Sequence, residues 1–172
     1  MKPAPFDMVR PDTIEEVLNF LSEKENAKLL AGGQSLVPLM NLRMSTPSLL
    51  IDLNRVIGLS GVELHTDSLR IGAMTRQATL LSDALVSKHA PLLREAAANV
   101  GHVQTRNRGT LGGSLAHADP AAELPLAVLT LDVTLVAMSS AVRDKYPLPL
   151  FLSTYSPLPC SPTNCLPKYA FH

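Results

Sequence analysis

Two short glycine-rich segments contain the residue types that bind an anionic group. The first glycine segment is AGGQSL, Ala31–Leu36, and the second glycine segment is TLGGS, Thr110–Ser114. A Gly-Gly pair lets the backbone approach a ligand closely, and hydroxyl side chains flank each pair. Where a helix begins, near Ser35, backbone N–H groups and the helix dipole favour a phosphate or pyrophosphate. Each segment alone is better explained as a tight turn, but the two together favour a phosphate-bearing ligand.

Neither segment matches a standard nucleotide motif. The sequence has no G-x-x-x-x-G-K-[ST] and no G-x-G-x-x-G, which excludes a P-loop and a Rossmann fingerprint. Ser35 and Ser114 also lack the G-x-S-x-G turn of a serine hydrolase. The identity of the ligand therefore does not follow from these motifs.

Two carboxylates, Asp119 and Glu123, follow the second glycine segment. One interpretation is structural: Asp119 caps a helix whose first turn is 120–122, and Glu123 interacts favourably with its dipole. The other is that both accept hydrogen bonds from ligand hydroxyl or ring N–H groups. We expect His102 and His117 to pack in the loop, because neither has the partner acid that a general base needs.

Alternating strand and helix patterns surround these residues and predict an α/β or α+β domain. Strands are expected at 27–32, 49–53, 68–75 and 134–138. Helices are expected at 13–24, 35–44, 75–100 with a break near Pro91, and 121–131. Asp12 is expected to cap the first helix, with Glu15 completing a capping box. Residues 109–125 are expected to form a loop that runs into the last helix.

Composition limits the function classes. The chain has 172 residues, is 46% hydrophobic and 17% charged, and balances 15 basic against 15 acidic residues. This profile is globular and does not indicate a nucleic-acid partner. No apolar run reaches about 18 residues, so no membrane span is expected, and the expected location is the cytoplasm. Cys160 and Cys165 lack partners at zinc spacing, so no metal site is expected.

Four motifs, in this order, resemble the FAD-binding (medium) subunit of molybdenum hydroxylases. They are LLAGGQSLVPLMNLRM, LLIDL, IGAMTRQATL and VGHVQTRNRGTLGGSLAHADPAAELP. The family includes the medium subunit of aerobic carbon monoxide dehydrogenase and the FAD domain of xanthine dehydrogenase. The resemblance covers roughly residues 1 to 138.

The resemblance implies an α+β fold with two α/β lobes and FAD between them. This is the FAD-binding domain of the vanillyl-alcohol oxidase or PCMH type. On this pattern the first lobe is 1–58, the second lobe is 59–140 and incomplete, and 141–172 is an irregular tail.

By the same resemblance, Ala31, Gly32, Gly33, Gln34 and Ser35 wrap the FAD pyrophosphate, with Leu36 beside them. Thr110, Gly112, Gly113 and Ser114 form a second FAD loop, and Asp119 and Glu123 lie near the ribityl chain and the ring.

The family also implies an oxidoreductase that works in a complex. A molybdopterin-binding large subunit oxidises the substrate, and an iron–sulfur small subunit passes electrons to FAD and on to an external acceptor. No catalytic acid–base residue is then expected in this chain. The alternatives are a truncated remnant without catalysis and a small binding or assembly module without flavin.

The sequence changes character after about Ser139. Both cysteines and all three tyrosines lie beyond it, and no helical or alternating period continues. When codons are assigned to this tail and read from the third base, permitted choices include PDELLTEVRF, which resembles a normal family continuation. We therefore expect a reading-frame change near 139–141, the alternative being a genuine divergent tail.

Overall fold

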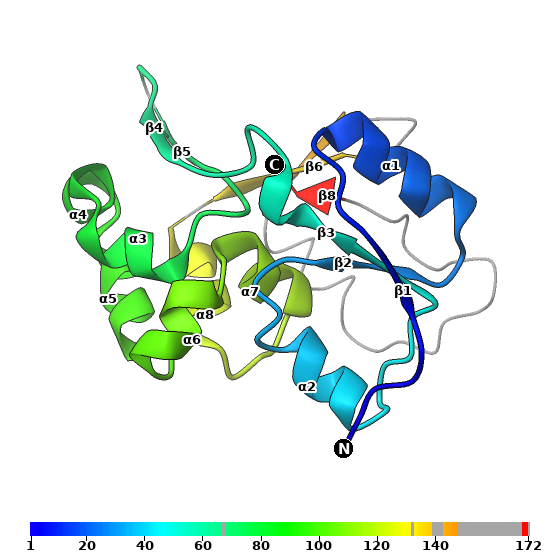
Figure 1. Ribbon diagram of the computed structural model, residues 1–172. Helices are drawn as coiled ribbons and strands as arrows, with labels where there is room; N and C mark the ends of the chain where they lie inside the picture. Colours follow the sequence, from blue (N-terminus) through cyan, green and yellow to red (C-terminus); the bar gives the residue numbers. More distant parts are fainter. Residues whose placement is uncertain (67, 132, 139–142, 148–169, 172) are drawn as a thin grey trace.

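A parallel sheet organises the first lobe, which runs from β1 to η1 (Figure 1). The computed structural model describes residues 1–66, 68–131, 133–138, 143–147 and 170–171. Strands β1 (Asp7–Val9) and β2 (Ala27–Leu30) both pair parallel with β3 (Leu49–Asp52), giving the order β1-β3-β2. Every residue of β3 is buried, as a central parallel strand requires. Strand β1 was not predicted from the sequence.

Helix α1 (Ile14–Glu23) begins one residue later than expected. Thr13, not Asp12, is the N-cap, and its side chain accepts a hydrogen bond from the Glu16 N–H at 3.3 Å. The Glu16 carboxylate in turn accepts from the Asp12 N–H at 2.9 Å. The predicted Asp12 and Glu15 capping box is therefore wrong, because Thr13 and Glu16 have the same three-residue spacing and supply the hydroxyl. The buried face of α1, with Val17 and Leu21, is as predicted.

The loops that follow β2 and β3 lead into short helical segments. After β2 the chain turns into α2 (Leu36–Asn41), and after β3 it forms the 3-10 turn η1 (Leu53–Arg55). Pro38 lies in the first turn of α2, where a missing N–H costs little. Both connections leave the carboxyl ends of neighbouring parallel strands, so the first glycine segment and η1 lie close together.

The second lobe, from β4 to β6, is mainly helical. An antiparallel hairpin of β4 (Val62–Leu64) and β5 (Leu69–Ile71) precedes the helices. The helical region expected at 75–100 is divided into α3 (Gln77–Ser82), α4 (Ala84–His89) and α5 (Pro91–Asn99). The expected break near Pro91 is confirmed, and a second break, at Asp83, was not expected. Asp83 caps α4 by accepting from the N–H groups of Leu85 and Val86, and Pro91 begins α5. Helix α6 (Val103–Arg108) follows.

The segment expected as a loop contains helix α7 (Leu111–His117), so that prediction is wrong. The Thr110 hydroxyl caps the helix by accepting from the Gly113 N–H at 3.1 Å. Ala118, in the left-handed conformation at φ 52°, ends it. Tertiary packing thus stabilises a helix that two glycines would disfavour in isolation.

Helix α8 (Glu123–Thr130) begins after the position expected from the sequence. Ala122, not Asp119, is its N-cap residue. Asp119 instead accepts a hydrogen bond from the Ala121 N–H at 2.9 Å, which closes a local turn ahead of the helix. Glu123 lies in the first turn of α8, as expected.

Strand β6 (Thr134–Met138) confirms the last predicted strand. It pairs antiparallel with β7 (Arg143–Pro147) and β8 (Ala170–Phe171), which lie within the segment expected to be irregular. Backbone pairing with β6 needs no alternating side-chain pattern, so these strands have no periodic signature in the sequence. The expected frame change and both cysteines lie outside the described residues.

None of the described helices is long and apolar enough to cross a bilayer.

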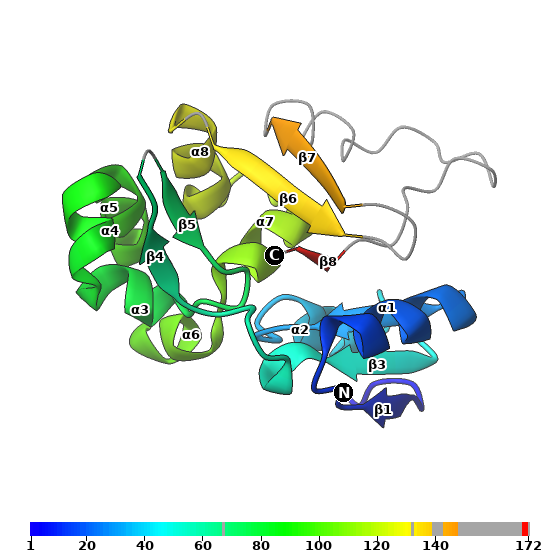
Figure 2. The ribbon, with the colours of Figure 1, turned by 90° about the horizontal axis from the view of Figure 1, so that it is seen from above.

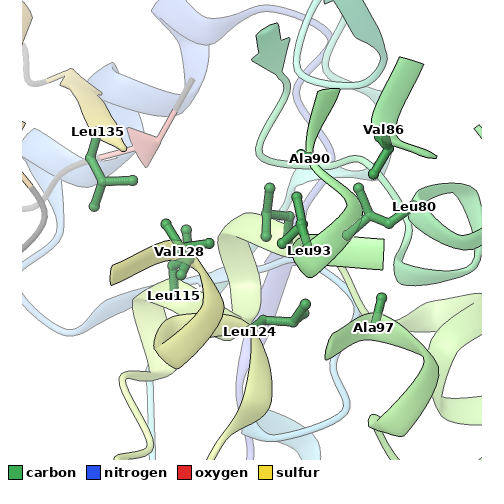
Figure 3. Close-up of a cluster of buried hydrophobic side chains, with 10 residues drawn as sticks. Leu80, Val86, Ala90, Leu93, Ala97, Leu115, Leu124, Val128 and Leu135 are labelled. Atoms are coloured by element: carbon green, nitrogen blue, oxygen red, sulfur yellow. The ribbon is translucent and has the colours of Figure 1, made fainter. Parts of the chain in front are cut away.

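Each lobe has its own apolar core. In the first lobe Val17, Leu21 and Ile51 pack together, and Leu59 and Met74 join them from beyond η1. In the second lobe the core gathers side chains from α3, α4, α5, α7, α8 and β6 (Figure 3). Leu93 of α5 and Leu124 and Val128 of α8 are buried in this second cluster.

Leu124 and Leu126, on the same helix α8, offer a matched test of the second core. Leu124 is fully buried, whereas Leu126 is 65% exposed. We expect Leu124→Ala to lower the free energy of unfolding by about 2–4 kcal/mol, because it leaves a cavity. Leu126→Ala should change it by less than about 0.5 kcal/mol. Urea denaturation measures both, and equal effects would contradict this description of the core.

Candidate functional site

A cleft of about 590 Å³ lies where the two lobes meet. Helices α2 and α7 lie at this junction in both ribbon views (Figures 1 and 2). The cleft is lined by both glycine segments, by Ala73, Met74 and Gln77, and by the end of α7 and start of α8. Every residue expected at the site lines it: Ala31, Gly32, Gly33, Gln34, Ser35, Leu36, Thr110, Gly112, Gly113, Ser114, Asp119 and Glu123. Segments separated by some 75 positions in the chain are therefore brought into one cavity.

Gly32 is the point where the lobes touch backbone to backbone. It is buried, and a Cβ atom on it would lie 2.2 Å from the Arg108 carbonyl oxygen and 2.8 Å from Gly109 Cα. Atoms cannot approach this closely, so any side chain at Gly32 would push the two segments apart. Gly33 next to it has φ 75°, a conformation that favours glycine. The first Gly-Gly pair is thus required both for a lobe contact and for a turn.

The second Gly-Gly pair seats the first turn of α7. A Cβ on Gly112 would lie 2.5 Å from the Cβ of Ala73, and one on Gly113 would lie 2.7 Å from the Thr110 hydroxyl oxygen. The Gly113 Cβ would also lie 3.4 Å from the Ala31 Cβ. The missing side chains let α7 pack against residue 73 and approach the first glycine segment.

The backbone N–H groups at the start of α7 are already hydrogen-bonded within the protein. Leu111 donates to the Thr75 carbonyl at 3.0 Å, and Gly112 donates to the Ala73 carbonyl at 2.8 Å. Gly113 donates to the Thr110 hydroxyl. These donors therefore hold the helix in place and are not free for an anion, contrary to the interpretation from sequence.

The first glycine segment differs in this respect. Within the described part of the chain, the N–H groups of residues 33–36 donate to no protein acceptor. Ser35, the N-cap of α2, forms no side-chain capping bond. Unpaired N–H groups at a helix start need water or a ligand as acceptor. This side of the cleft therefore presents free donors.

Polar side chains line the remaining wall. Asp119 and Glu123 face the cleft together with His117, whereas His102 does not line it. Gln77, which is 6% exposed, also lines it, and its carbonyl oxygen has no hydrogen-bond partner among the described residues. Sequence reasoning missed Gln77, although it lies in the motif IGAMTRQATL, because one polar residue at a helix start gives no distinctive signal.

Curated relatives share the sequence over most of this chain. The 6-hydroxypseudooxynicotine dehydrogenase complex subunit alpha of Paenarthrobacter nicotinovorans is 52% identical over 149 residues, 86% of this chain and 50% of the relative. The carbon monoxide dehydrogenase medium chain of Hydrogenophaga pseudoflava is 38% identical over 160 residues, 92% of this chain and 56% of the relative. The chain spans about half the length of these relatives.

Solved structures share the fold. Carbon monoxide dehydrogenase from Hydrogenophaga pseudoflava, in a form lacking the Mo-pyranopterin moiety, matches with a TM-score of 0.86 and 38% identity, over 88% of this chain and 53% of that chain. Quinoline 2-oxidoreductase from Pseudomonas putida 86 matches with a TM-score of 0.84 and 40% identity, over 86% of this chain and 52% of that chain. These matches confirm the expected fold class.

The family described as "FAD binding domain in molybdopterin dehydrogenase" matches residues 4–166. That match includes both glycine segments and every described element of the two lobes. It agrees with a two-lobed fold, a cleft at the lobe junction and relatives that are dehydrogenase subunits. The chain therefore belongs to the family of FAD-binding domains of molybdopterin dehydrogenases.

Proposed function

We propose that the cleft between the lobes binds FAD and that this chain is the flavin-carrying part of a molybdenum-containing hydroxylase or dehydrogenase. The observation that carries the proposal is the pairing of two different walls in one cleft. Free N–H donors at residues 33–36 form one wall, and the glycine-seated start of α7 forms the other. A ligand with a phosphate part and an extended body matches this arrangement.

The two glycine segments have different roles, because only the first has a run of N–H groups without a protein acceptor among the described residues. We assign the FAD pyrophosphate to Ala31–Leu36, because charge-assisted bonds from N–H groups to phosphate oxygens are strong. The second wall is formed by Thr110, Gly112, Gly113 and Ser114. Because the N–H groups at the start of α7 are already hydrogen-bonded within the protein, this part of the wall contributes shape and no free N–H donors. Asp119 and Glu123 accept from hydroxyl or ring N–H groups of the ribityl and flavin part.

This chain supplies binding and orientation. Bound FAD would supply the redox chemistry that links an electron donor to an external acceptor. The relatives are named as a complex subunit and a medium chain. We extend this to a molybdopterin-binding large subunit and an iron–sulfur small subunit as partners, and a cytoplasmic location remains part of the proposal.

A charge placed beside the free donors tests the pyrophosphate assignment. Gln34 is exposed and lines the cleft, so Gln34→Glu should leave folding intact while repelling phosphate. We expect the Kd for FAD to rise about 5- to 20-fold, and the effect to shrink as salt screens the charge. The measurement is quenching of flavin fluorescence on titration of the apoprotein at two salt concentrations.

Gln104→Glu is the matched control, because Gln104 is exposed on α6 and does not line the cleft. It should leave the Kd unchanged. An unchanged Kd for Gln34→Glu would refute the placement of the pyrophosphate. A chain that stays colourless and binds no flavin would refute the proposed function itself and favour a binding module without flavin.

Gly32→Ala tests the contact between the lobes. The new methyl group would collide with the Arg108 carbonyl, so we expect stability to fall by about 1–3 kcal/mol. FAD binding should weaken as well, because the walls of the cleft separate. Gly58→Ala is the comparison: Gly58 has φ 83° and no atom within 4 Å of the added Cβ. It should lower stability through backbone strain and leave the Kd for FAD unchanged.

We also propose the frame change near residues 139–141. Sequencing the gene from the codon of residue 130 onwards tests it. The expected result is a single-base insertion or deletion near residues 139–141, after which the DNA encodes a family-like continuation in another reading frame. A continuous frame would refute it in favour of a genuine tail, which the family match up to residue 166 supports.

A further inference from the structure

A chain of side-chain hydrogen bonds connects the two glycine segments behind the cleft. Asn54 of η1 donates from Nδ2 to the Ala31 carbonyl at 3.1 Å. Arg76, the residue before α3, donates to the Asn54 amide oxygen at 2.5 Å. Its other terminal nitrogen donates to the Arg108 carbonyl. We name this connection from Ala31 through Asn54 and Arg76 to Arg108 the Asn54–Arg76 relay.

The relay is anchored in the sheet of the first lobe. Asp52, the last residue of β3, is only 7% exposed. Its Oδ1 accepts from the Asn54 backbone N–H at 3.0 Å and from the Asn54 side-chain amide at 2.5 Å. Its Oδ2 lies 3.2 Å from Arg10 Nε, so the carboxylate is also ion-paired. A buried, paired carboxylate therefore holds Asn54 in one orientation.

The ends of the relay are the carbonyl groups beside the lobe contact. Ala31 immediately precedes Gly32, and Arg108 immediately precedes Gly109. The Arg108 carbonyl oxygen is the atom that a side chain on Gly32 would meet. Neither Asn54 nor Arg76 lines the cleft; both line a smaller hollow of about 290 Å³. They can therefore affect the cleft only through the two backbone segments.

Arg76 suits this bridging role because its planar guanidinium directs several donors at fixed angles. Its two hydrogen-bond acceptors are a carbonyl and an amide oxygen, both neutral. Burial, and after it the Arg108 guanidinium, lower the pKa of Arg76, whereas Asp52 raises it. The side chain is thus partly desolvated, which strengthens hydrogen bonds that it makes to both lobes.

We propose that Asn54 and Arg76 are positioning residues that fix the separation of the two glycine segments and thereby the width of the FAD cleft. This inference rests on the proposed binding of FAD. It differs from a direct electrostatic role, in which the Arg76 charge alone would attract the pyrophosphate.

A double-mutant cycle on the full chain tests the relay. The variants are Asn54→Ala, Arg76→Met and their combination, and the quantity measured is the Kd for FAD by flavin fluorescence. We expect each single variant to weaken binding about tenfold, because one missing member breaks the whole relay. The double variant should be less than about twofold weaker than either single variant, since linked residues are non-additive.

Arg94→Met is the matched control. Arg94 also donates to a backbone carbonyl, that of Leu81 at 3.0 Å, but within the second lobe and away from the cleft. It should bind FAD as the unsubstituted chain does. Arg76→Lys separates geometry from charge: it keeps the positive charge but lacks the planar pair of donors, so binding should stay several-fold weaker.

Hydrogen exchange of the apoprotein provides a readout without flavin. In Arg76→Met and Asn54→Ala, the hydrogen-bonded amides of Leu111, Gly112 and Gly113 should exchange faster, while those of β1, β2 and β3 should not. Normal affinity in Arg76→Met, full recovery in Arg76→Lys, additive losses, or unchanged exchange of these three amides would each overturn the relay. Failure of the unsubstituted chain to bind FAD would overturn the proposed function and this inference together.

Discussion

The contact between Gly32 and the backbone of Arg108 and Gly109 is the constraint on which the rest of the site depends. It leaves no space for a side chain, since a Cβ would lie 2.2 Å from a carbonyl oxygen. The contact holds the end of β2 against the end of α6. The walls of the cleft are the segments that continue from this point, so their spacing follows directly from it. A larger residue here would alter the cleft by moving the segments apart, in addition to changing one residue that lines it.

The two Gly-Gly pairs look alike in sequence but serve different purposes. At the start of α7 the N–H groups bond to the backbone of residues 73 and 75 and to the Thr110 hydroxyl, which ties the helix to its own lobe. After β2 the N–H groups of residues 33–36 find no protein acceptor among the described residues. One pair therefore builds the scaffold, and the other leaves donors for a ligand. Glycine permits both, because each needs close approach of backbone to something else.

Polar side chains outside the cleft complete the arrangement. Asp52 is buried at the end of β3, pairs with Arg10 and orients Asn54, which with Arg76 reaches both sides of the lobe junction. In such a network each member supplies a hydrogen-bond partner to the next, so removing one member leaves its neighbours without that partner. The sheet of the first lobe thus stabilises the geometry of a cleft that lies beyond its edge.

Local sequence patterns determined much of the fold: the apolar stripe of α1, strands β2, β3 and β6, the alternation of strands and helices, and the segments that line the cleft. These features depend on residues close together in the chain, where spacing is visible. Tertiary structure alone decided that residues 111–117 are helical, that Gln77 lines the cleft, and that Asn54 and Arg76 join Ala31 to Arg108. Each of these depends on atoms contributed by distant segments. The Ala73 carbonyl accepts a hydrogen bond from the Gly112 N–H of α7, and the relay joins residues 31 and 108. Pairwise contacts across such separations leave no periodicity in a single sequence, so only the folded chain reveals them.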